Sequence, residues 1–175
     1  MEWTVLYHDL GKQVVAGQRD ALHAFRSAVL AARALPGLGF HASAAYLTGL
    51  EPWAELVTSA SIVASDGEGR VQDNRLLPAI VQGSEELFGA GSPAALIVQA
   101  VLLHESLNVV PEWPNPAGLT EDEFPLCIRP ALVLLLEGSM PVDSDAWELF
   151  APASKAKFRQ STLAVFADVR RRVGC

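Results

Sequence analysis

The fold of this chain is decided by an apolar stretch that reads Ser92-Pro93-Ala94-Ala95-Leu96-Ile97-Val98-Gln99-Ala100-Val101-Leu102-Leu103. Ser92 is a favoured N-cap residue, and a proline directly after it has the backbone angle of a first helical turn. The residues that follow are apolar on nearly every side, which is typical of a helix buried in a core. We therefore expect a central helix from Pro93 to about Val109.

The rest of the chain also predicts helices. Apolar residues recur at helical spacing, and glycine and proline separate the segments. The helices predicted in this way cover Asp20–Leu35, His41–Leu47, Pro52–Ala64, Asn74–Leu87, Pro130–Glu137 with Gly138 as its stop, and a last segment from Ser154. Thr120-x-x-Glu123 fits a capping box, while Ser65–Gly69 and Pro111–Gly118 are predicted loops. Glu2–Leu6 is the one segment expected to form a short strand.

Length and composition favour one all-α domain spanning residues 1–175, a bundle of about six to eight helices. A chain of 175 residues can bury a substantial core. Half of its residues are hydrophobic and 19% are charged, which is typical of a compact globular protein rather than a disordered one.

Charge and hydropathy argue against several classes of protein. The net charge is −7 and the one basic cluster, Arg170-Arg171-Arg172, suits a helix C-terminus, so we expect no nucleic-acid binding. The longest apolar run, Ala94–Leu103, is too short to cross a membrane. Two cysteines, Cys127 and Cys175, do not make a disulfide framework. With no signal peptide at the N-terminus, the expected location is the cytoplasm.

The segment most relevant to chemistry is Tyr7-His8-Asp9-Leu10-Gly11-Lys12. Histidine and aspartate are both ligands for divalent metals. Neighbouring helical residues lie about 100° apart, so both side chains can reach one ion only where two helices meet. The same letters also fit an ordinary helix end, with Gly11 as the C′ residue, Lys12 complementing the helix dipole, and His8 and Asp9 in solvent. Both interpretations stay open at the level of sequence.

This segment resembles the His-Asp signature of the HD-domain metal-dependent phosphohydrolases. The resemblance implies an HD-like all-α bundle that uses a divalent metal such as Mn, Fe, Mg or Zn to hydrolyse a nucleotide or another phosphate ester. His8 and Asp9 would be metal ligands, with Asp9 essential for catalysis, and Lys12 would contact a phosphate oxygen. A weaker likeness extends through Asp20 and His23 to Leu38-Gly39-Phe40, and makes His23 a further candidate ligand. Some HD-like proteins use iron for oxygen chemistry instead.

The chain departs from the HD pattern in its order. Only seven residues precede His8, whereas the superfamily places a helix with another histidine there. The segment Leu103-His104-Glu105-Ser106-Leu107-Asn108-Val109 resembles that missing helix, so His104 could supply the imidazole in a permuted arrangement. Alternatively, Glu105 could stand where the superfamily has its final aspartate.

A second hypothesis is a non-catalytic, acidic α-helical binding protein on a degenerate HD-like scaffold. Such a protein could neutralise a basic protein partner, as immunity proteins and antitoxins do, or bind a small ligand. The chain has no Gly-x-Ser-x-Gly elbow, no phosphate-binding glycine loop and no paired Cys-x-x-Cys motif to suggest other chemistry. The hypotheses differ on whether His8, Asp9 and a third side chain lie within about 2–2.5 Å of one point.

Overall fold

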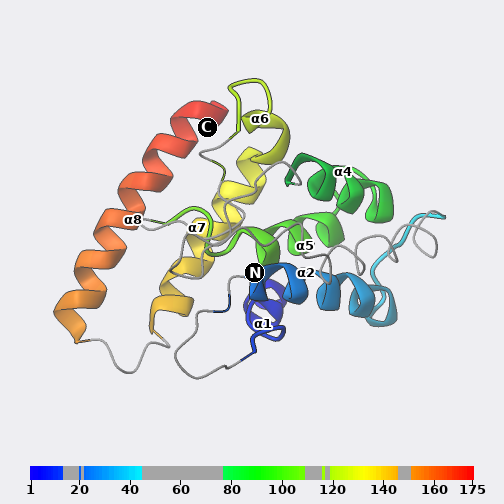
Figure 1. Cartoon of the computed structure of the whole chain (residues 1–175), viewed down its shortest axis with the longest axis horizontal. Coiled ribbons are helices and arrows are strands. Elements are labelled where there is room, and N and C mark those ends of the chain that lie inside the picture. The colour runs from blue at the N-terminus through cyan, green and yellow to red at the C-terminus, as the bar shows by residue number, and fades with distance from the viewer. Residues whose placement is uncertain (14–19, 21, 45–76, 109–115, 117–118, 146–150) are drawn as a thin grey trace.

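The computed structural model describes residues 1–13, 20, 22–44, 77–108, 116, 119–145 and 151–175. These residues form seven α-helices, one short 3-10 helix and no strand, in a single compact unit (Figure 1). The all-α prediction is therefore confirmed. The elements are α1 (Glu2–Tyr7), α2 (His23–Ala34), η1 (Leu35–Leu38), α4 (Leu77–Phe88), α5 (Pro93–Leu103), α6 (Phe124–Cys127), α7 (Pro130–Asp145) and α8 (Pro152–Val173).

Helix α5 lies at the centre, as its sequence predicts. It packs against α1, α2, α4 and α7, and every residue from Ile97 to Leu103 is buried. Its N-terminus is capped by Ser92, whose Oγ accepts a hydrogen bond from the Ala95 amide at 3.1 Å. The helix ends at Leu103 rather than near Val109, and a turn follows. This early end places His104 at the tip of a buried helix.

Helix α1 replaces the strand expected at Glu2–Leu6, and that prediction was wrong. Its aromatic and β-branched residues favour strands locally, but Trp3 and Tyr7 stand one helical turn apart and both pack against the core. Trp3 also meets Phe40 edge to face, with ring centroids 6.1 Å apart. Tertiary packing therefore overrides the local preference.

Helix α7 also departs from expectation, because it passes through Gly138 and Pro141 and continues to Asp145. A Cβ atom added to Gly138 would lie 2.6 Å from the methyl group of Met1. The Met1 side chain therefore lies over Gly138, which stands inside the helix and does not end it. The short α1 packs against α7 at this point.

The remaining helix predictions have mixed outcomes. The Thr120–Glu123 capping box is present, with reciprocal side-chain to amide hydrogen bonds of 2.9 and 3.2 Å. Helix α8 begins at Pro152, two residues before the predicted start at Ser154, and Arg170, Arg171 and Arg172 lie in its last turn, as expected. Residues 41–44 are not helical. The segments Pro52–Ala64 and Ser65–Gly69, and most of Pro111–Gly118, lie outside the described residues.

Among the described helices, none combines the length and the apolar character needed to cross a bilayer.

Candidate metal centre

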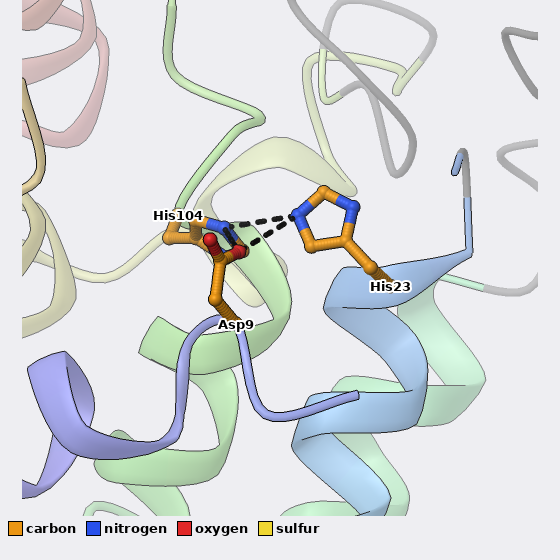
Figure 2. A group of neighbouring side chains, drawn as sticks. All are labelled: Asp9, His23 and His104. Atoms are coloured by element: carbon orange, nitrogen blue, oxygen red, sulfur yellow. Dashed lines mark hydrogen bonds and ion pairs between the residues drawn. The ribbon is translucent and has the colours of Figure 1, made fainter. Parts of the chain in front are cut away.

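Three ionisable side chains from distant parts of the chain meet at one point (Figure 2). Asp9 lies in the turn after α1, His23 is the first residue of α2, and His104 follows the last residue of α5. The His23 Nε2 and His104 Nε2 atoms are 3.2 Å apart, and they lie 3.4 and 3.7 Å from Asp9 Oδ1. Both imidazoles are buried, with side-chain exposures of 5% and 6%.

The backbone fixes which nitrogen of each ring carries the proton. His23 Nδ1 lies 2.7 Å from the Asp20 carbonyl oxygen, and His104 Nδ1 lies 2.8 Å from the Val101 carbonyl oxygen. A carbonyl oxygen can only accept a hydrogen bond, so Nδ1 must be the donor in both rings. In the neutral imidazoles each Nε2 then carries a lone pair.

The cluster therefore brings acceptor atoms together without a donor between them. The two Nε2 lone pairs face each other across 3.2 Å, and the carboxylate oxygen beside them is also an acceptor. Asp9 Oδ1 is buried and makes no hydrogen bond within the described part of the chain. Buried polar atoms are almost always paired, so three acceptors on one point call for a cation.

The spacing of the three atoms fits one metal ion. A triangle with sides of 3.2, 3.4 and 3.7 Å has a circumscribed circle of radius about 2.0 Å, the length of a Zn–N or Zn–O bond in proteins. Asp9, His23 and His104 would hold such an ion through one atom each. Two histidines and one carboxylate with open positions are a known ligand set for catalytic metals.

The turn that carries Asp9 is held against α2 by close backbone packing. A Cβ on Gly11 would lie 2.5 Å from the Ser27 amide nitrogen, so only glycine fits there. The Gly11 amide donates to Ser27 Oγ at 2.9 Å, and Arg26 Nε donates to the Gly11 carbonyl at 2.9 Å. Arg26 also pairs with Asp20 at the start of α2. Gly11 therefore brings Asp9 next to His23 and does not act as a helix C′ residue.

Electrostatics keep Asp9 and His23 in the forms that bind metals. Burial raises the pKa of Asp9, but the neighbouring side chains, including the Lys12 ammonium group, lower it by more, so the pKa of this carboxyl lies well below its usual range. Burial lowers the pKa of His23, and the hydrogen bond to the Asp20 carbonyl offsets this only in part. Asp9 is thus ionised and His23 is neutral near pH 7, as metal ligation requires.

Two other predicted site residues lie beside the cluster. Lys12 Nζ is 3.0 Å from Asp9 Oδ2, on the solvent side of the carboxylate. His8 Nδ1 lies 2.6 Å from the Val5 carbonyl oxygen, and its ring meets that of His104 edge to face at 5.2 Å. His8 Nε2 is 3.9 Å from Asp9 Oδ2. His8 thus borders the converging group of three and is not one of its members.

Glu105 is not brought to the site, although the sequence made it a candidate ligand. It follows His104 in a tight turn, which directs consecutive side chains apart, and Asn108 Nδ2 lies 3.5 Å from its Oε2 atom. Gly11 and Ser27 were missed as supporting residues. These two residues bring the turn after α1 against α2, and a contact between two separate segments leaves no pattern within either sequence.

Comparisons with protein-family models, with curated proteins and with solved structures find no match to this chain.

Proposed function

We propose that Asp9, His23 and His104 bind one divalent metal ion and that the protein is a metal-dependent hydrolase of small phosphate esters. The observation that carries the proposal is the meeting of two Nε2 lone pairs and a buried carboxylate oxygen at bonding distance from one point. The resemblance of His8–Lys12 to the HD signature supports phosphate esters as the substrate class.

The reaction is an ordinary hydrolysis. The oxygen of water bonds to phosphorus, the bond from phosphorus to the ester oxygen breaks, and the alcohol leaves with one proton of the water. The other proton stays on the phosphate. A divalent ion at this site supplies a Lewis acid and lowers the pKa of a water molecule.

The chain's own residues hold the reactants and move the proton. Asp9, fixed by the Gly11 contact with α2, presents Oδ1 inward and Oδ2 outward. Lys12 lies at the outer oxygen of Asp9. Its ammonium group can leave this ion pair and bind a phosphate oxygen of the substrate instead. His8, with Nδ1 held by the Val5 carbonyl, directs an Nε2 lone pair to the edge of the site and can carry the proton to the alcohol.

A second candidate function is oxygen chemistry with iron. The observation that favours it is the ligand set itself, because two histidines and one carboxylate are the ligands of many non-haem Fe(II) oxygenases. Turnover that needs both Fe(II) and dioxygen would identify this alternative. Turnover that proceeds without dioxygen would identify the hydrolase.

The test measures release of phosphate from p-nitrophenyl phosphate and nucleoside monophosphates with added Mn, Fe, Mg or Zn. Asp9→Asn keeps the shape of the side chain but loses its charge, and we expect at least about a 100-fold loss of activity. Glu105→Gln is the matched control and should retain activity. Equal activity in the Asp9→Asn variant and the wild type, or failure of the wild type to bind any of the four metals, would contradict the proposal.

A further inference from the structure

A cavity of about 110 Å³ opens beside the metal centre. His8 and His104 form part of its wall, so a molecule in the cavity would lie directly against the site. The rest of the wall comes from α1, α7, α8 and the residues that follow α5. Its apolar surfaces include Leu107, Leu136, Met140 and Phe166. Apart from His104, no residue of this wall supplies one of the three metal-binding atoms.

No aspartate, glutamate, lysine or arginine is among the described residues that line the cavity. Among the described residues that line the cavity, the two histidines are the only ones with ionisable side chains. A phosphate or carboxylate placed deep in the cavity would lose its hydration without gaining a countercharge, which is strongly unfavourable. A charged group must therefore stay at the metal end, near Lys12, while an uncharged group occupies the cavity.

One polar atom in the wall has no partner in the described structure. Thr4 is 1% exposed, and its Oγ1 atom makes no hydrogen bond there. Two other hydroxyls in the wall are already used, since Ser139 Oγ donates to the Leu136 carbonyl and Thr162 Oγ1 donates to Asn108 Oδ1. Because buried hydroxyls are normally paired, we expect the Thr4 hydroxyl, which has almost no accessible surface, to turn toward a ligand that brings one hydrogen-bonding group.

We infer that this cavity binds the organic part of the substrate, and that this part is a small, uncharged, mainly apolar group with one hydroxyl or carbonyl. The inference rests on the proposed function for the phosphate at the metal end. A cavity of about 110 Å³ has room for roughly seven to ten non-hydrogen atoms, which is too few for a nucleoside. The substrate class is therefore the phosphate ester of a small apolar alcohol.

The test uses metal-free protein in EDTA, so that it does not depend on the metal site. Benzyl alcohol, toluene and benzoate are titrated while the methyl NMR signals of Leu107, Leu136 and Met140 are followed. We expect benzyl alcohol to bind and to shift these signals, toluene to bind more weakly, and benzoate not to bind. No shift with benzyl alcohol, or equal binding of benzoate, would overturn the inference.

Two variants locate the binding. Thr4→Val removes the hydroxyl at nearly constant shape. It should weaken the binding of benzyl alcohol about five- to tenfold and leave the affinity for toluene unchanged. Ser139→Leu should fill the cavity and abolish binding of both, whereas Ser154→Leu, a matched change on the exposed first turn of α8, should have no effect. If Ser139→Leu does not fold, Thr4→Val still decides the test, because an unchanged affinity for benzyl alcohol overturns the role of Thr4.

The two proposals fail separately. Metal binding by a protein that ignores benzyl alcohol would overturn the cavity inference alone. Benzyl alcohol binding by a protein that takes up no metal would overturn the proposed function and leave an apolar ligand site.

Discussion

Buried polar side chains occur at two places along α5, and their hydrogen bonding differs. In the middle of the helix, Gln99 Nε2 donates to Ser84 Oγ at 2.8 Å, and Ser84 Oγ donates to the Val81 carbonyl at 2.6 Å. Each donor there has an acceptor. At the C-terminal end, His104 Nε2 meets His23 Nε2 and Asp9 Oδ1, and all three atoms are acceptors.

The difference separates a structural network from a binding site. Gln99 and His104 are both nearly fully buried, so burial does not distinguish them. The matching of donors and acceptors does, because a matched network is complete when the protein folds and a cluster of acceptors needs a cation from outside. The middle of α5 should therefore matter for stability alone, and its end for metal binding.

The largest expected effect is stabilisation by metal. At a free metal concentration 1,000-fold above the dissociation constant, the folded state should gain about 4 kcal/mol, and EDTA should remove this gain. His104→Ala should lose most of the gain. His41→Ala, a change at an exposed histidine outside the cluster, should keep all of it. Calorimetric melting of the wild type and the two variants, with and without metal, measures this gain. An equal gain in His104→Ala would contradict the assignment of the end of α5 to metal binding.

The next effect concerns the turn that carries Asp9. Gly11→Ala places a methyl group 2.5 Å from the Ser27 amide nitrogen, where backbone must move. We expect a loss of about 1–3 kcal/mol of stability together with weaker metal binding. Gly37→Ala is the matched control, since an added Cβ meets nothing within 4 Å there. Urea unfolding and metal titration provide the two readouts, and Gly11→Ala behaving like Gly37→Ala would contradict the packing argument.

The smallest expected effect concerns the hydrogen-bonded pair in the middle of α5. Gln99→Leu removes the donor to Ser84 and should cost about 1 kcal/mol of stability while leaving metal affinity unchanged. Adding Ser84→Ala removes both partners, and should restore part of the loss. Denaturant midpoints of the single and double variants, beside their metal affinities, make the measurement. A change in metal affinity would mean that the two places along α5 are coupled.

Local signals predicted much of the fold. Ser92-Pro93 and the Thr120–Glu123 capping box act within one helical turn, and both give the expected hydrogen bonds. The strand assigned to Glu2–Leu6 was wrong because Trp3 and Tyr7 pack on the core from one face of a helix, and the stop assigned to Gly138 was wrong because α7 continues through it. The start of α1 packs against α7, a contact between distant segments that no local pattern contains.

The candidate site was predictable in its members and not in its assembly. Asp9, His23 and His104 were among the candidate ligands, together with His8 and Glu105, but His23 and His104 are 81 positions apart in the sequence. Their meeting depends on where α5 ends and on how closely Gly11 approaches α2. The sequence left Glu105 and His104 as competing candidates, and the turn after α5 brings only His104 to Asp9.

The most direct test of the central claim is the NMR signal of each imidazole nitrogen in metal-free protein, followed during addition of zinc. Before zinc, His23 and His104 should both carry the proton on Nδ1 and a lone pair on Nε2. During the titration the Nε2 signals of these two residues should shift together, while those of His41 stay unchanged. A proton on Nε2 of either residue, combined with no shift on adding zinc, would contradict the account.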